Sequence, residues 1–414
     1  MKNTIFKNAV SLTVLTALLL SLVSCGLIAP IEVPDTTEAV TTAPSTTAPD
    51  TTAPDDTTAP DDTTSETKPS TVTISMVGDV LLHEKVADSG KMPDGTYNYD
   101  HMFVNVRDHI EKADIALVNQ EVILGGRELG LYGYPNFNGA FEVGDSLANA
   151  GFDIILHATN HTLDRGKIAV ENCMNFWKTS HPEIEYLGIH ESAEDQDNIY
   201  LREENGMIIA FLNYTYGTNG MPIPADAPYI VDILSEDRLR RDIAKAEEIA
   251  DFTVVLPHWG TEYILTPDNN QRYWANIMFQ CGADLVIGTH PHVIEPVEMM
   301  TDGDHSMLVY YSIGNFINST AQSGEGIANR MVGGIADVTL SKDESGAVYI
   351  SDYGVTPIVT HVLTGSGKIT TYKLSDYTGE LAKQNEIISQ DRNFSLGYCK
   401  NLVLKVFGDL ANYD

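Results

Sequence analysis

The chain has 414 residues, of which 43% are hydrophobic and 20% are charged, and its formal net charge is -33. The length allows one large domain or two smaller ones, and the composition is that of a globular protein. Such an acidic surface repels phosphate backbones and anionic headgroups, which argues against nucleic acid as a partner and against direct electrostatic binding to lipid. An anionic substrate would need a local cation, such as a metal ion.

The N-terminus predicts an export signal. Two lysines precede an apolar run from Ala9 to Val23, about 22 Å long as a helix and short of the roughly 30 Å of a hydrocarbon core. Leu-Val-Ser-Cys-Gly at 22–26 is similar to the lipobox of bacterial lipoproteins, and a plain signal peptide with a chance cysteine is the alternative. We predict a lipoprotein signal peptide at residues 1–25, lipidation at Cys25, and export to the extracytoplasmic face of the cell membrane.

The composition of residues 26–70 predicts a disordered linker. Thr-Thr-Ala-Pro recurs there, interspersed with aspartates, and no apolar periodicity is available to offset the entropy of ordering. Proline and like charges keep such a chain extended. We interpret the segment as a tether between the membrane anchor and a folded domain at 71–385, with a C-terminal extension at 386–414.

The folded domain opens with two apolar strands that end in acidic residues. Thr71 to Val77 runs into Gly78-Asp79, and residues 113–118 end in Asn119-Gln120-Glu121. Each carboxylate alone is either a metal ligand or an ordinary turn residue. His83 either points at the same site or lies on the surface.

The third strand, residues 152–156, gives a stronger signal because Asn160-His161 follows it and Asp164 comes three residues later. An Asn oxygen and a neutral His nitrogen are both metal ligands. Asp164 is well spaced to accept a hydrogen bond from the His161 ring and so to orient it.

Two later strands end in histidines. Residues 252–256 lead to His258, and residues 285–287 lead to His290 and His292. Histidines at strand ends are positioned more like metal ligands than like core residues.

Four residues near these histidines are less certain members of the site. Trp259 either stacks on a substrate or caps the core, and Glu262 is either a site residue or an ordinary loop carboxylate. Glu295, three residues after His292, is a candidate to orient a ligand. After a further strand at 307–312, Asn315 either lines the site or bonds a turn.

Together, five strands of an expected parallel sheet carry polar side chains at equivalent ends, where open α/β sheets place their sites. Carboxylates, an amide oxygen and imidazoles suit Mn, Fe or Zn better than Ca or Mg alone. Such ligands exceed the needs of one tetrahedral zinc, so one or two divalent ions are expected. The polar residues at the five strand ends are Asp79, Glu121, Asn160, His161, His258, His290 and His292.

The order of these blocks resembles the CapA family of bacterial capsule-synthesis proteins, which is associated with poly-γ-glutamate. The blocks are Gly78-Asp79, Asn119-x-Glu121, Asn160-His161-x-x-Asp164-x-Gly166, His258-Trp259-Gly260, His290-Pro291-His292 and Gly314-Asn315-Phe316. That family is similar to calcineurin-like metallophosphoesterases, which implies a four-layer α/β/β/α sandwich, metallophosphatase-like. The resemblance implies as metal ligands Asp79, Glu121, Asn160, His258, His290 and His292, with His161 acting on the reacting group.

Two departures from the phosphoesterase pattern stand out. Asp79 is followed by Val80-Leu81, so the Asp-x-His block is absent, and Glu121 replaces the bridging Asp. Three functions therefore remain: a metal-dependent hydrolase or acyl-transferase acting on an anionic polymer such as poly-γ-glutamate, a phosphoesterase, or a non-catalytic subunit for polymer binding or export. In the first, His161 with Asp164 would supply acid–base catalysis. Integral-membrane synthesis or export proteins are possible partners.

Overall fold

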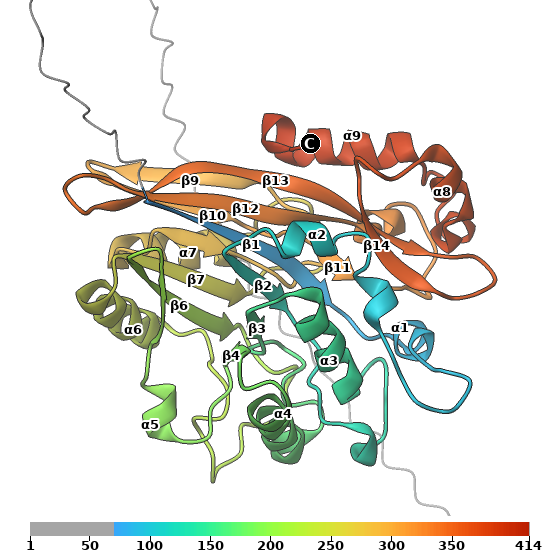
Figure 1. The fold of residues 1–414 in the computed structure, drawn as a ribbon, viewed down its shortest axis with the longest axis horizontal. Helices are drawn as coiled ribbons and strands as arrows, with labels where there is room; N and C mark the ends of the chain where they lie inside the picture. Colours follow the sequence, from blue (N-terminus) through green and yellow to red (C-terminus); the bar gives the residue numbers. More distant parts are fainter. Residues whose placement is uncertain (1–69, 414) are drawn as a thin grey trace, which may run out of the picture. The chain divides into compact units, whose positions relative to one another are not determined.

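The computed structural model describes residues 70–413, drawn in colour in Figure 1. The predicted signal peptide at 1–25, its Cys25 and, except for Ser70, the predicted linker at 26–70 lie outside the described residues. Among the helices of residues 70–413, none combines the length and the apolar character needed to cross a membrane.

The first sheet has eight strands, and β1 (Ser70–Val80) lies near its centre. On one side of β1 three parallel strands follow in chain order: β2 (Ile115–Asn119), β3 (Ile154–Leu156) and β4 (Glu185–Leu187). On the other side lie three antiparallel strands: β12 (Val332–Lys342), β13 (Val348–Val362) and β14 (Ile369–Lys373). The short β11 (Asn315–Ile317) pairs in parallel with the end of β1, where Asp79 is opposite Asn315.

The second sheet has six strands in the order β5-β6-β7-β8-β10-β9. Its four inner strands are parallel: β6 (Met207–Thr215), β7 (Phe252–His258), β8 (Leu285–Ile287) and β10 (His305–Tyr310). The edges, β5 (Tyr200–Glu204) and β9 (Val297–Asp302), are antiparallel to their neighbours.

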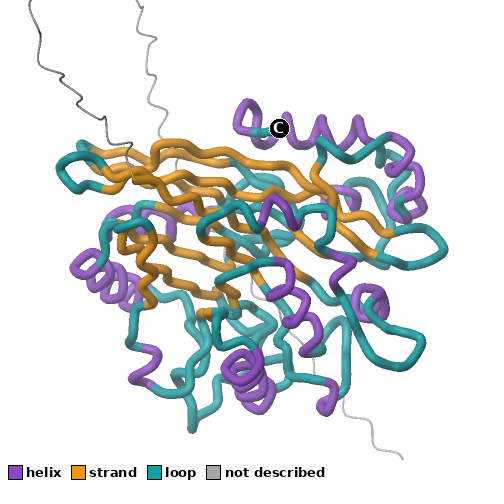
Figure 2. The backbone as a smooth tube through the Cα atoms, in the orientation of Figure 1, coloured by secondary structure: helices purple, strands orange, loops and turns teal. Residues whose placement is uncertain are grey.

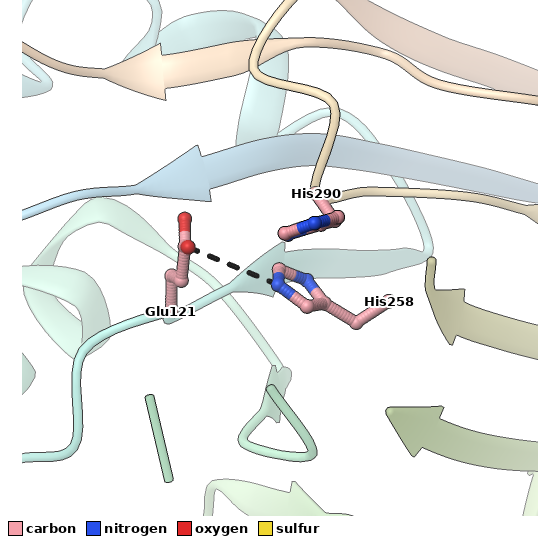
Figure 3. Close-up of side chains that lie close together, drawn as sticks. All are labelled: Glu121, His258 and His290. Atoms are coloured by element: carbon pink, nitrogen blue, oxygen red, sulfur yellow. Dashed lines mark ion pairs between the residues drawn. The ribbon is translucent and has the colours of Figure 1, made fainter. Parts of the chain in front are cut away.

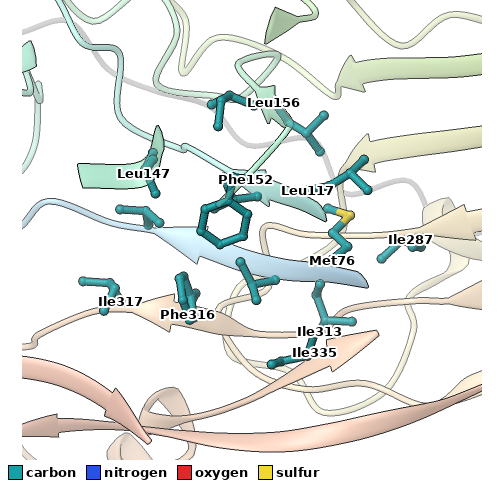
Figure 4. Packing of buried hydrophobic residues seen from close by; sticks show 14 of the residues in the cluster. Met76, Leu117, Leu147, Phe152, Leu156, Ile287, Ile313, Phe316, Ile317 and Ile335 are labelled. Carbon is teal, nitrogen blue, oxygen red and sulfur yellow. The ribbon is translucent and has the colours of Figure 1, made fainter. Parts of the chain in front are cut away.

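Alternation along the second sheet explains how the layers form, because successive side chains of a strand point to opposite faces. Leu285 and Ile287 of β8 join a core cluster with the first sheet, whereas Val286 between them joins a second cluster on the other face. That outer face is covered by α6 (Glu236–Ile249) and α7 (Asn269–Cys281). Figure 4 shows side chains of both sheets in the cluster between them.

Other helices cover the first sheet. They are α3 (Phe141–Ala150) and α4 (Gly166–Ser180), together with α8 (Gly379–Gln384) and α9 (Leu396–Phe407), which pack beside β13. Figure 2 shows the helices in purple around the strands in orange. Two packed sheets with helices outside them confirm the predicted α/β sandwich. The short helices α1 (Glu84–Ser89), α2 (Arg107–Ile110) and α5 (Ala193–Gln196) lie in the connections.

The segment that we separated as a C-terminal extension, 386–414, contributes α9 to this packing. Cys399, Val403 and Phe407 of α9 are buried in the core cluster that both sheets share. The cluster also holds Phe394, which precedes the helix. Within the described residues, this part of the chain therefore packs against the domain rather than projecting from it.

A close backbone approach joins β11 to β1. A Cβ atom on Gly78 would lie 1.8 Å from the backbone oxygen of Gly314. Only a residue without a side chain allows the two segments to lie this close. The contact brings Asp79, the next residue, beside Asn315, and the N–H of Asp79 donates to the oxygen of Gly314 at 3.2 Å.

Candidate metal centre

Strand ends from both sheets meet at one place. Asp79 lies at the end of β1 and Glu121 lies two residues after β2, both in the first sheet. His258 is the last residue of β7, in the second sheet. The turns after β3 and β8 add Asn160, His161, His290 and His292. All seven side chains are buried, so the carboxyl ends of parallel strands deliver them to an enclosed site.

Asp79 and His292 form one side of this centre. Oδ2 of Asp79 lies 3.1 Å from Nδ1 of His292, and Asn119 donates from Nδ2 to Oδ1 of Asp79 at 2.7 Å. Burial lowers the pKa of His292, but the nearby carboxylates of Glu121 and Asp79 outweigh this effect and raise that pKa to about 9. This side therefore places a buried carboxyl group against an imidazole ring.

Glu121 lies at the middle of the centre. Its Oε1 is 3.6 Å from Nε2 of His292, 3.8 Å from Nε2 of His258 and 4.0 Å from Nε2 of His161. Figure 3 shows this carboxylate facing the rings of His258 and His290. Both Glu121 oxygens are buried and have no hydrogen-bond donor. Burial raises the pKa of Glu121 well above its usual range, against the opposing effect of His292. A buried carboxylate without a donor is costly unless a cation neutralises it.

His258 and His290 form the other side. Nε2 of His258 lies 2.9 Å from Oδ1 of Asn160, and its Nδ1 lies 3.0 Å from the hydroxyl of Thr289. Nδ1 of His290 is buried without a hydrogen-bond partner. Burial and the neighbouring histidines lower the pKa of both rings well below the usual range, which favours the neutral form that binds metals.

These side chains fit a divalent cation. Three overlapping groups place their ligand atoms within 4.8 Å of one another: Glu121 with His258 and His290, Asp79 with Glu121 and His292, and Glu262 with His290 and His292. Carboxylate oxygens and imidazole nitrogens suit Mn, Fe and Zn. The unpartnered atoms of Glu121 and His290 are the atoms that such an ion would satisfy.

The backbone at this site is strained. His290 has φ 97° and His292 has φ 58°, both in the left-handed region that favours glycine. Residues persist in that region when the surrounding structure holds them there, and such residues cluster at ligand-binding sites. The turn after β8 therefore gives up local stability to point two imidazoles into the centre.

His161 and Asp164 form a hydrogen-bonded pair at the edge of the centre. Nδ1 of His161 lies 2.7 Å from Oδ2 of Asp164, which also accepts the backbone N–H of Phe137 at 2.7 Å. The ring of Phe137 packs edge-on against His161, with the centroids 4.7 Å apart. Because Nδ1 is engaged, the free Nε2 of His161 is the nitrogen that faces Glu121 and any bound group.

The remaining predicted residues divide into three positions. Asn315 is buried beside the centre, where Oδ1 lies 3.1 Å from Nδ1 of His292 and Nδ2 donates to the backbone oxygen of His292. Glu262 is exposed and reaches His290 and His292. Trp259 is only 1% exposed and donates to the backbone oxygen of Tyr311 from the outer face of the second sheet, so its ring caps the core and offers no face to a substrate.

Two further positions, His83 and Glu295, differ in their relation to the centre. His83 packs edge-on against Phe137, whose ring also contacts His161, so His83 lies near the centre. Burial, with the charge of His292, lowers the pKa of His83 to about 4. Glu295 is buried, and its carboxylate accepts a hydrogen bond from Gln271 of α7.

Sequence reasoning missed three residues that contact the centre or its rim. Asn119 and Thr289 contact Asp79 and His258, and Asn119 directly follows the predicted strand at 113–118 whereas Thr289 directly precedes His290. Arg330 lies far along the chain from every motif. The strand-end pattern contains the signal for the first two, whereas only the fold brings Arg330 to the site.

Comparison with known proteins gives a consistent result. Residues 73–320 match the family described as bacterial capsule synthesis protein PGA_cap. The chain is 28% identical over 255 residues to the capsule biosynthesis protein CapA of Bacillus anthracis, covering 59% of each chain. It is 28% identical over 228 residues to the PGA biosynthesis protein CapA of Bacillus subtilis (strain 168), covering 53% of each chain. The chain thus spans little more than half the length of these relatives.

Two nucleotidases are among the solved structures that match this chain. The NAD nucleotidase NadN of Haemophilus influenzae is 12% identical, with a TM-score of 0.42 over 81% of this chain and 59% of that chain. A 5'-nucleotidase precursor of Thermus thermophilus is 12% identical, with a TM-score of 0.41 over 81% of this chain and 58% of that chain.

Proposed function

Since the chain belongs to the PGA_cap family of bacterial capsule synthesis proteins, we propose that it is a metal-dependent hydrolase or acyl-transferase acting on poly-γ-glutamate or a related anionic polymer. The proposed metal is Mn, Zn or Fe, as one or two ions. The observation that carries the proposal is the Glu121 carboxylate, which is buried without a hydrogen-bond donor and lies within 4.0 Å of three histidines.

The proposed ligands are Asp79, Glu121, Asn160, His258, His290 and His292. A bound divalent ion polarises a carbonyl group and lowers the pKa of a bound water. Asn119 and Asn315 orient the ligands that they contact, because each donates to Asp79 or to the backbone of His292. Burial of the whole set excludes bulk water and strengthens the local field.

His161 has the proposed role of general acid or base. Its Nδ1 bond to Asp164 fixes the ring and leaves Nε2 at the edge of the centre, where the side chain is 9% exposed. A proton held at Nε2 would go to the leaving group, and an unprotonated Nε2 would accept a proton from the attacking nucleophile. Asp164 would stabilise the charged ring between these steps.

The setting proposed for this chemistry is outside the cell. A lipid anchor at Cys25 and the extended linker would hold the domain near the membrane surface, where membrane proteins that synthesise or export the polymer are the proposed partners. Palmitate labelling in cells, compared between the wild type and Cys25→Ser, tests the anchor. Equal labelling of the two proteins would refute it.

A direct test uses protein purified without chelator. Elemental analysis is expected to find Mn, Zn or Fe, and incubation with poly-γ-glutamate and that metal is expected to change the polymer length. His292→Ala should lose both properties, whereas His305→Ala, on β10 and outside the cluster, should keep them.

Two outcomes would replace this proposal. Turnover of small phosphate esters that is lost in His161→Ala, without any action on the polymer, would favour a phosphoesterase. A metal-free protein whose His292→Ala variant still supports polymer formation in cells would favour a non-catalytic subunit for polymer binding or export.

A further inference from the structure

Arg330 is a shielded cation beside the metal centre. It lies in a short 3-10 helix (Ile327–Met331) and is 9% exposed. Its guanidinium carbon lies 3.4 Å from the centroid of the Tyr263 ring. Among the described residues, only its Nη2 has a hydrogen-bond partner, Oε1 of Gln322 at 2.8 Å. The remaining nitrogens of a planar, five-donor group are therefore unused.

The missing partner distinguishes Arg330 from most other arginines between residues 70 and 413. Those that pair with a carboxylate within 4.0 Å are Arg107, Arg127, Arg202, Arg238, Arg240, Arg241 and Arg272. No carboxylate within the described residues lies this close to Arg330, although the protein carries 58 acidic residues. Unlike Nε of Arg165, the unpaired nitrogens of Arg330 are not fully buried, so they are open to a partner that arrives from outside.

The contacts of Arg330 place it next to the metal ligands. The Tyr263 ring, which covers the guanidinium, has its centroid 5.8 Å from that of His292. Asn315 donates from one nitrogen to the backbone oxygens of both His292 and Arg330. Arg330 and the metal centre therefore border the same space.

We infer that Arg330 binds an oxyanion of the substrate beside the bond that reacts at the metal centre. In poly-γ-glutamate this oxyanion is a carboxylate. The inference rests on the proposed function. A guanidinium binds a carboxylate through two parallel hydrogen bonds, and the nitrogens that this requires are unused here. A protein with a net charge of -33 repels a polyanion over most of its surface. Arg330 supplies an attractive contact where the chain must enter.

The carboxylate of the neighbouring Glu262 is not the ion-pair partner of Arg330 within the described residues. It acts on the charge of Arg330 from beyond ion-pairing distance, and its carboxylate is grouped with His290 and His292. A structural role for Arg330 would rest on the Tyr263 stacking and the Gln322 contact alone. That role predicts altered thermal stability in variants, whereas substrate recognition predicts altered affinity with a normal melting temperature.

The test measures binding of two probes, poly-γ-glutamate and polyphosphate, to Mn²⁺-loaded protein by titration calorimetry. Arg330→Met is expected to weaken binding roughly 10-fold to 100-fold, the effect of losing charge-assisted hydrogen bonds. Arg330→Lys is expected to recover only part of the loss, because an ammonium cannot bind in two-pronged fashion. The matched control is Arg272→Met, since Arg272 also stacks on a tyrosine but pairs with Glu298 away from the site.

The outcomes separate the inference from the function on which it rests. Weaker binding of poly-γ-glutamate by Arg330→Met identifies a carboxylate as the bound oxyanion. Weaker binding of polyphosphate alone identifies a phosphate. Wild-type affinity in both Arg330 variants, or an equal loss in Arg272→Met, overturns the inference and leaves the proposed function intact. If Arg330→Met does not fold, wild-type affinity in Arg330→Lys alone overturns it. A wild-type protein that binds neither probe overturns the proposed substrate and this inference with it.

Discussion

Asn160 and His258 face each other across the junction of the two sheets, with Oδ1 of Asn160 2.9 Å from Nε2 of His258. Asn160 follows β3 of the first sheet, and His258 ends β7 of the second. Neither sheet holds a complete set of ligands. The centre therefore forms only when the two sheets pack, and an ion bound there would join them.

Metal removal is expected to lower the melting temperature. An ion that binds only the folded state stabilises it by about 2.7 kcal/mol at a concentration 100 times its dissociation constant. Calorimetry with EDTA, and then with excess Mn²⁺ or Zn²⁺, measures the difference. His292→Ala should remove the metal-dependent rise and His305→Ala should retain it. A rise of equal size in both variants would place the binding outside this centre.

His161→Ala is expected to lower turnover of the polymer by about 100-fold to 10,000-fold, the usual range for a general acid or base. Asp164→Asn should reduce turnover less, because the asparagine amide still offers an oxygen to the His161 ring but lacks the negative charge that stabilises the protonated ring. Mn²⁺ affinity, measured on the same samples, should remain at the wild-type value. Variants that lose metal and activity together would show that His161 acts as a ligand instead.

Glu295→Gln is expected to stabilise the protein at high pH. Burial raises the pKa of Glu295 to about 8, against the opposing hydrogen bond from Gln271, whereas an unfolded Glu titrates near pH 4.3. The folded state thus binds the proton more tightly, and stability from this group is present at low pH and is lost as pH rises toward 8. The free energy of unfolding of the wild type should fall relative to that of the variant by at most about 1.4 kcal/mol per pH unit between about pH 4.3 and about pH 8.

Denaturant unfolding of both proteins from pH 4 to pH 9 isolates this effect, because their other titrating groups are the same. The difference in unfolding free energy between Glu295→Gln and the wild type should be small at pH 4 and should reach its full size near pH 8. A constant difference across the range would mean that Glu295 titrates normally.

Gly78→Ala is expected to weaken both folding and metal binding. The new Cβ would lie 1.8 Å from the oxygen of Gly314, so β11 must move away from β1 and Asn315 with it. Overpacking of this kind costs about 1–3 kcal/mol. Gly379→Ala is the matched control, because no atom lies within 4 Å of its added Cβ and alanine favours the helix α8 that begins there.

Denaturation and Mn²⁺ titration of both variants check this expectation. The control should gain up to about 1 kcal/mol in stability and bind metal as the wild type does. Unchanged Mn²⁺ affinity in Gly78→Ala would show that the β1–β11 contact does not position the ligands.

Much of the centre was predictable because its residues sit directly after short apolar strands. Asp79, Glu121, His258 and His292 needed no tertiary information beyond the rule that parallel strands end at one edge. The strand pattern predicted one parallel sheet, and only the family resemblance implied the two sheets that the structure has, because a strand's partner depends on contacts far along the chain. Arg330 was missed for the same reason.

Residues with two plausible environments were the hardest to assign. Trp259 directly follows His258, and the sequence left substrate stacking and capping of the core equally open, but the side chain lies in the cluster on the outer face of the second sheet. Glu295 follows His292 by three residues and is turned toward α7. Period-two alternation explains the first case, and a change of chain direction after the turn explains the second.

If the proposed centre binds a metal ion, the packing between the sheets would affect which ion it prefers. Met76, Leu117 and Ile287 fill the layer on which both halves of the ligand set rest (Figure 4). We expect a change in the volume of one such side chain to alter the separation of the sheets and therefore the distance between Asn160 and His258. Ions of different radius require different gaps, so apolar residues that never touch a ligand would tune the discrimination between Mn and Zn. Selection for another metal could act on the hydrophobic interior and leave every ligand unchanged.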